Sequence, residues 1–149
     1  MKKIMLAAFV SISCSSLFAQ KNAVKENEVP NDVKTSFHRD FPTAANVVWE
    51  KEGGSFEAVF TIDADKMSAE YTKKGYRKEL EKQIDLKDLP PAAVEYIKKN
   101  VAGAKLMEAS KTVTDKAVVT YEARIMTDGK FKELIFDANG KYLKKDSGD

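Results

Sequence analysis

The fold is decided by two stretches of sequence, SFEAVFTI at residues 55–62 and AVVTYEARI at residues 117–125. In each stretch apolar side chains recur at every second position, which is the period of a β-strand with one buried face. In the first, Phe56 and Phe60 share the apolar face and Glu57 lies on the other. We therefore expect antiparallel strands that cover a core with one face and meet solvent with the other.

A short amphipathic helix precedes each of these stretches. Phe37 and Phe41 lie one helical turn apart after Pro30, and Ile97 and Val101 repeat that spacing in the second half of the chain. Each helix has about three turns, which is too few for a helix to persist alone in water. We expect both helices to pack on the apolar sheet face, against the aromatic and aliphatic positions of the strands.

The two halves of the chain resemble each other, residues 29–84 aligning with residues 85–146. Pro30 falls on Pro90, and Gly75 falls on Gly140 at the same kind of turn. The predicted fold class is α+β, a tandem repeat of a helix plus a four-stranded antiparallel sheet, with the helices packed on one sheet face. The expected strands are 46–51, 55–62, 67–73 and 76–82 in the first repeat, and 105–113, 117–125, 131–136 and 141–145 in the second.

The N-terminal residues 1–19 have the layout of a secretory signal peptide. Lys2 and Lys3 precede a short apolar run, and Ala19 is followed by Gln20 and a polar stretch, which predicts cleavage between these two residues. The apolar run is too short to span a membrane. Residues 20–28 are then expected to be a flexible leader, and the protein to be periplasmic or secreted.

An alternative reading of this segment involves Cys14, the one cysteine of the chain. A lipoprotein signal ends in a cysteine that is acylated, so anchoring through Cys14 stays open. Cleavage after Ala19 would remove Lys2 and Lys3, and the net charge would fall from +2 to zero. A neutral chain has no overall attraction for nucleic acid, so we expect no nucleic-acid partner. We also expect no membrane span and a monomer.

A wider set of residues carries a family resemblance. The set is Val29-Pro30, Val33, Phe37, Phe41-Pro42, Ala44, Val47, Trp49-Glu50, Phe56-Glu57-Ala58, Phe60, Tyr71 and Gly75, echoed by Leu89-Pro90, Val94, Ile97, Tyr121-Glu122-Ala123 and Phe136-Asp137-Ala138-Asn139-Gly140-Lys141. Over about residues 29–145 the chain resembles the PepSY-like family of exported bacterial proteins, whose fold is similar to the beta-lactamase inhibitor protein. The resemblance implies no cofactor, no established activity and an inhibitor-like or protein-binding role.

The residues themselves offer no catalytic constellation. His38 is the one histidine and has no evident nucleophile or orienting partner in the sequence. Asp63 and Asp65 lack the further ligands of a calcium loop, and Glu79 and Glu81 alternate with lysines as on a solvated strand face. We therefore predict no catalytic, cofactor-binding or metal-binding residue, and no enzyme.

Two functions remain open at this point. The first is an exported, non-enzymatic binding module, inhibitor-like in the sense of the resemblance, that holds a protein or peptide of the cell envelope on the open face of its sheet. The second is an envelope structural or stress protein without a dedicated ligand. For the binding module, the candidate contact residues are Trp49, Val59, Tyr76, Val118 and Tyr142, of which Trp49 also fits a core position.

Overall fold

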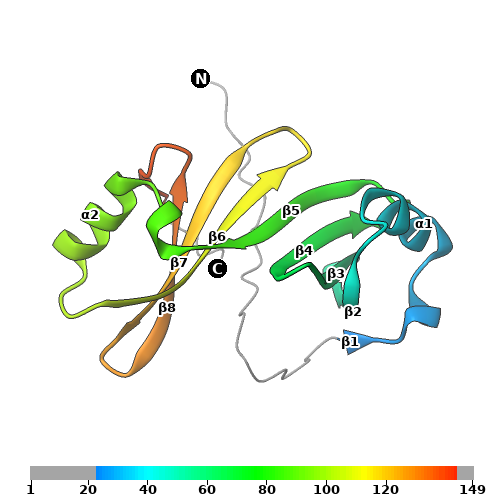
Figure 1. Ribbon diagram of the computed structural model, residues 1–149, viewed down its shortest axis with the longest axis horizontal. Helices are drawn as coiled ribbons and strands as arrows, with labels where there is room; N and C mark the ends of the chain where they lie inside the picture. Colours follow the sequence, from blue (N-terminus) through cyan, green and yellow to red (C-terminus); the bar gives the residue numbers. More distant parts are fainter. Residues whose placement is uncertain (1–22, 144–149) are drawn as a thin grey trace.

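The computed structural model of the chain describes residues 23–143 (Figure 1). Residues 1–22, with the expected cleavage site at Ala19 and Gln20 and with Cys14, lie outside the described residues. The elements, in chain order, are β1 (Ala23–Val24), the short 3-10 helix η1 (Glu26–Glu28), α1 (Asn31–Asp40), β2 (Ala45–Glu52), β3 (Ser55–Ile62), β4 (Asp65–Thr72), β5 (Arg77–Ile84), η2 (Leu86–Asp88), α2 (Pro91–Asn100), β6 (Lys105–Thr114), β7 (Val119–Thr127), β8 (Lys130–Asp137) and β9 (Tyr142–Leu143).

The expected fold class, α+β with a tandem repeat of a helix plus a four-stranded antiparallel sheet, is wrong. Within residues 23–143, the nine strands form one antiparallel sheet in the order β1 to β9, and two short α-helices accompany it. The ladder crosses the expected boundary between residues 84 and 85, since β5 pairs with β6 from Glu79↔Thr114 to Ile84↔Ala109. This pairing satisfies backbone groups that would otherwise be exposed on two sheet edges.

The expected 20–28 leader contains β1 and η1 in its described part. β1 pairs Ala23 with Glu50 and Val24 with Trp49, which adds a strand at the edge of the sheet. At the other edge, β9 pairs Tyr142 with Phe136. Both edge strands are only two residues long.

The buried residues form two clusters on the helix-bearing face of the sheet. One joins Val33 and Phe37 of α1 to β2, β3 and β4, and the other joins Ala93 and Ile97 of α2 to β6, β7 and β8. Figure 1 shows α1 and α2 at opposite ends of the sheet, linked by the long curved strand β5. The ring centroid of Phe37 lies 5.1 Å from that of Phe60, an edge-to-face contact typical of packed cores.

The eight positions that the helical and strand periods predict as core all lie in the layer between the helices and the sheet. Phe37, Phe41, Phe56, Phe60, Ile97 and Ile125 are buried, while Val101 and Tyr121 are half-buried against the second cluster.

The expectation that Glu57 meets solvent is wrong. Glu57 lies on the opposite face from Phe56, as expected, but it is only 5% exposed. Its strand lies inside the sheet, and Glu50 and Glu70 are its direct cross-strand neighbours, so adjacent side chains flank it on both sides.

Three hairpin turns share one five-residue geometry. They span 72–76, 114–118 and 137–141, and in each the N–H of the first residue donates to the C=O of the fifth at 2.9–3.0 Å. The fourth residue has a positive φ, which is 76° at Gly75, 58° at Ala117 and 82° at Gly140. Only glycine adopts this conformation without a steric cost, so Ala117 carries local strain that the two glycines avoid.

The first and third of these turns pack closely on the helices. A Cβ built on Gly75 would lie 2.5 Å from the carbonyl oxygen of Asp32 in α1, and one on Gly140 would lie 2.8 Å from the backbone nitrogen of Ala93 in α2. Glycine at these positions therefore permits a close approach between turn and helix, as well as the positive φ.

Candidate functional site

The face of the sheet away from α1 and α2 is called the open face here. It is defined by the strand positions that alternate with the core positions, such as Glu57, Val59 and Glu81. Both helices pack on the other face, so within residues 23–143 no α-helix covers the open face. This face is where a partner could contact the sheet over several strands.

Four glutamates lie side by side across the open face, and we call them the glutamate row. Glu50 of β2 pairs with Glu57 of β3, Glu57 with Glu70 of β4, and Glu70 with Glu79 of β5. Directly opposed side chains in an antiparallel sheet have Cβ atoms about 4.5–5.5 Å apart, and like charges there oppose folding. Lys78 offsets part of this repulsion, because its ammonium group forms an ion pair with Glu70.

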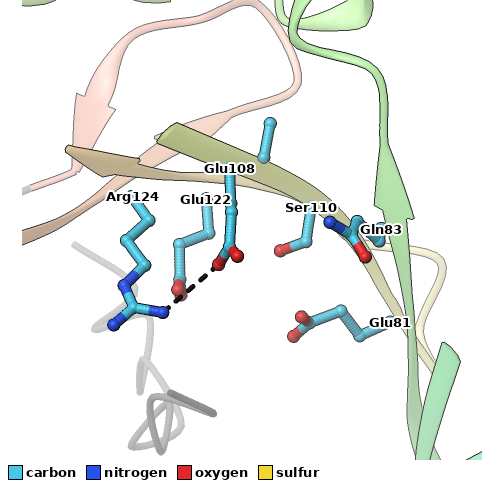
Figure 2. Close-up of a pocket in the computed structure, with 7 residues that line it drawn as sticks. Glu81, Gln83, Glu108, Ser110, Glu122 and Arg124 are labelled. Carbon is cyan, nitrogen blue, oxygen red and sulfur yellow. Dashed lines mark hydrogen bonds and ion pairs between the residues drawn. The ribbon is translucent and has the colours of Figure 1, made fainter. Parts of the chain in front are cut away.

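A shallow hollow of about 40 Å³ adjoins the glutamate row, formed by β5, β6 and β7. Figure 2 shows the side chains of Glu81, Glu108, Glu122 and Arg124 around it. Gln83, Ala109 and Ser110 complete the lining. Small-molecule sites usually enclose about 300–1,000 Å³, so this hollow has room for one small polar group and not for a metabolite.

Arg124 is anchored at the rim of this hollow. Its Nη1 lies 3.2 Å from Oε2 of Glu108, and its guanidinium carbon lies 4.2 Å from the ring centroid of Phe131. Phe131 lies beside Arg124 and is 52% exposed. The guanidinium group is thus held between a carboxylate and an aromatic ring, which is a common arrangement for arginine.

Glu81 is the carboxylate whose protonation the site alters most clearly. Burial raises the pKa of its side chain, and the negative charge of Glu133 acts in the same direction. Hydrogen bonds to Ser110 and Thr112 act against this rise in pKa. A carboxylate placed in this way costs folding free energy when it is charged, and a nearby cation would reduce that cost.

A second cavity, of about 280 Å³, lies between β1, β2 and α1. Phe37, Val47 and Trp49 form much of its wall, and His38 and Glu26 contribute polar atoms. His38 is exposed in the last turn of α1, with its ring in an edge contact with Phe37 at 5.6 Å. Within residues 23–143, no group of three or more His, Cys, Asp or Glu side chains is arranged to hold a metal ion.

The five contact residues expected from the sequence do not converge. Trp49 is 5% exposed and packs on Phe37 at 5.2 Å, so its ring belongs to the core. Val59 is half-buried on the open face opposite Val48. Tyr142 is half-buried and stacks on a helix residue, Tyr96, with ring centroids 4.7 Å apart.

Tyr76 and Val118 lie in neighbouring turns at one end of the sheet. They are 70% and 53% exposed, and the two turns meet where the N–H of Asp115 donates to the C=O of Lys78 at 2.7 Å.

The residues around the hollow were missed as a site by sequence reasoning. Glu79 and Glu81 were interpreted as a solvated strand face because they alternate with lysines. The register shows that Glu81 instead lies between Ser68 and Thr112, with lysine side chains such as Lys82 on the other sheet face. The sequence did contain a signal for this placement. Glu57, Glu81 and Glu122 each alternate with core positions along their strands, which puts their side chains on the face away from the core.

No protein-family model matches the chain, and no curated protein matches it. Several solved structures share its fold. A candidate periplasmic protein from Bacteroides eggerthii superimposes with a TM-score of 0.71 at 13% identity, covering 78% of this chain and 86% of that one. A DUF2874 family protein from Bacteroides ovatus has a TM-score of 0.67 at 18% identity, covering 77% and 84%.

A further match is a BLIP-like protein from Bacteroides fragilis, with a TM-score of 0.61 at 16% identity, covering 76% of this chain and 83% of that one. At these identities the likeness concerns the fold alone. It supports the fold that the family resemblance implies, which is similar to the beta-lactamase inhibitor protein. None of the three structures carries the PepSY-like name, so membership of that family stays a prediction. Within residues 23–143, neither α-helix is long and apolar enough to cross a membrane.

Proposed function

We propose that the protein is an exported, non-enzymatic binding module that holds a protein or peptide on the open face of its sheet. The observation that carries this proposal is the open face itself, which is polar, spans seven strands from β2 to β8 and has no α-helix packed on it within residues 23–143. Broad faces with only a small hollow suit contacts with a polypeptide better than the enclosure of a small substrate.

The fold likeness adds support of a weaker kind. One structure of the same fold is described as a candidate periplasmic protein and another as BLIP-like. A shared fold does not fix function, so these names support the class of protein and its compartment only as analogies. An inhibitor-like role is one form that such binding would take.

Site-directed cross-linking tests the proposal. Cys14 is the one cysteine of the chain and lies in the predicted signal segment, so a cysteine introduced elsewhere can carry a unique photoactivatable label after export. Met126→Cys places the label at a half-buried position on the open face, and Glu95→Cys places it at an exposed position on α2 as a matched control. Both proteins are incubated with native envelope extract.

We expect a discrete adduct from position 126 and none from position 95. Equal labelling of the same species from both positions, or none from position 126, would favour the alternative of a structural or stress protein without a dedicated ligand. N-terminal sequencing of the exported protein should begin at Gln20, whereas a chain that begins with an acylated Cys14 would establish a membrane anchor.

A further inference from the structure

We propose that the cavity between β1, β2 and α1 is a binding site for a small organic amine, that is, a protonated amino group carried on an apolar body. The cavity lies at the edge of the sheet beside α1, and the proposal does not depend on what binds to the open face.

The size of this cavity suits one small molecule. Its volume is about 280 Å³, against about 40 Å³ for the hollow on the open face. At the packing density of protein interiors, about 0.75, this space holds about 200 Å³ of ligand atoms, which is enough for an aromatic ring with a short side chain. The volume is also close to the lower end of ordinary small-molecule sites, about 300 Å³.

The walls of the cavity are mostly apolar and come from three elements. β1 and η1 form one wall, β2 a second and α1 a third, and Figure 1 shows these elements together at one end of the molecule. The rings of Phe37 and Trp49 pack edge to face at 5.2 Å, and both residues are buried, so this part of the wall is rigid. A site that is formed before the ligand arrives has a smaller entropic cost of binding. The apolar lining residues are Ala23, Val24, Phe37, Val47, Val48 and Trp49.

Two polar residues complete the lining, Glu26 of η1 and His38 of α1. The internal repeat of the chain accounts for His38. α1 and α2 lie 60 residues apart, at 31–40 and 91–100, and His38 therefore corresponds to Lys98. Both residues lie in the last turn of their helix, where a basic side chain is favoured by the helix dipole. His38 is thus explained by the helix itself.

Glu26 has no such explanation. η1 and η2 are also 60 residues apart, at 26–28 and 86–88, and Glu26 corresponds to Leu86. The second half of the chain thus builds the same short helix with an apolar residue at this place, so the fold does not require a carboxylate there. We infer that the Glu26 side chain serves the cavity that it lines.

The charge of the cavity favours a cation. Glu26 supplies a carboxylate, and among the described residues that line the cavity there is neither a lysine nor an arginine. The last turn of α1 reaches the cavity through His38, and the carbonyl groups at a helix C-terminus carry partial negative charge. Aromatic walls such as Phe37 and Trp49 also suit organic cations better than anions.

These features together define the ligand. Its amino group donates hydrogen bonds to the carboxylate of Glu26, and its apolar body lies against Val24, Val47 and Trp49. A carboxylic acid of the same shape would bring its charge against that of Glu26, and a neutral alcohol would lose the charge-assisted hydrogen bond.

The fluorescence of Trp49 tests the proposal directly, because Trp49 lines the cavity and is the one tryptophan of the chain. The purified exported protein is titrated with 4-phenylbutylamine, 4-phenylbutanol and 4-phenylbutyrate, which share one apolar body and differ in charge. We expect a saturable change in emission with the amine, with half-saturation at about 1 mM or below. The carboxylate should bind at least about tenfold more weakly than the amine, since a hydrogen bond to a charged group contributes about that factor.

Three variants locate the ligand. Glu26→Gln keeps the shape of an exposed side chain, and should weaken binding of the amine about tenfold while changing binding of the alcohol less than about twofold. Glu95→Gln removes the same charge from α2, away from the cavity, and should change neither affinity. Val47→Phe fills part of the cavity and should weaken both ligands. Circular dichroism and thermal melting check that each variant is folded.

Four results would overturn the proposal. No saturable change in Trp49 emission below about 10 mM amine would show that the cavity holds no such ligand. The carboxylate binding as tightly as the amine would show that the site does not select a cation. Equal weakening by Glu26→Gln and Glu95→Gln would indicate an effect of net charge alone. Unchanged amine binding by folded Val47→Phe would place the ligand outside the cavity.

Discussion

Replacing Gly75 by alanine should destabilise the protein by about 3 kcal/mol, for two separable reasons. An L-residue at φ 76° costs about 1 kcal/mol relative to glycine. The added Cβ would also lie 2.5 Å from the carbonyl oxygen of Asp32 and 2.7 Å from Oγ of Ser36. Because a helix carbonyl cannot rotate away, α1 must shift, and overpacking of this kind costs about 1–3 kcal/mol.

Gly129 provides the matched control for this prediction. Its φ is 70°, but a Cβ built on it meets no atom within 4 Å. Gly129→Ala should therefore cost only the backbone contribution, about 1 kcal/mol. The difference between the two variants, about 2 kcal/mol, isolates the contact between the turn and α1.

Urea denaturation followed by tryptophan fluorescence measures this difference. Trp49 is the one tryptophan of the chain and packs on Phe37 of α1, so its emission reports the end of the molecule that contains Gly75. Circular dichroism on the same samples checks that the whole sheet unfolds in the same transition. If Gly75→Ala costs no more than Gly129→Ala, the close packing of this turn on α1 is refuted.

Phe60→Ala should lower the free energy of unfolding by about 3–5 kcal/mol in chemical denaturation, because Phe60 is 1% exposed. Val118→Ala, at a 53% exposed position, should lower it by under about 0.5 kcal/mol. Similar losses in the two variants would contradict the assignment of the core. Ala117→Gly should raise the free energy of unfolding by about 0.5–1 kcal/mol by relieving the positive φ, and a lower stability would show that Ala117 is not strained. Burial raises the pKa of Glu81, so the folded state retains a proton that the unfolded state loses, and stability should fall as pH rises above about 4.5 toward the raised pKa. Glu81→Gln should lessen this fall in denaturation series between pH 4 and 7, and an identical pH dependence would refute the burial of the charged form.

The sequence predicted the parts of the fold that depend on side-chain period. Phe37, Phe56 and Phe60 recur at helical or strand spacing, and all three are buried as expected. The turn at Gly75 was also expected, because a glycine between two alternating segments is a local turn signal.

The pairing of β5 with β6, which joins the two halves of the sheet, could not be predicted in the same way. β5 has the sequence RKELEKQI, which alternates charges and shows only a weak apolar face. Its pairing with β6 is made by backbone groups, and side-chain period does not encode which strand a backbone pairs with.

The hollow could not be predicted from the sequence, for a related reason. Glu81, Glu108 and Glu122 are far apart in sequence and become neighbours only through the registers of β5, β6 and β7. Once those registers are known, the alternation of side chains along each strand places all three on the open face.

The order of the strands has a consequence for how the chain acquires its structure. Every strand pairs with its neighbours in sequence, and all but two of the pairings are hairpins closed by short turns. Isolated hairpins form within about 1–10 μs, and chains dominated by such local contacts fold fast. The exceptions are β1 with β2, across α1, and β5 with β6, across α2. The loops that these two pairings close, residues 25–44 and 85–104, are equally long and so have a similar entropic cost of closure, but only the second brings the two ends of the molecule together. Each end can therefore organise before β6 pairs with β5.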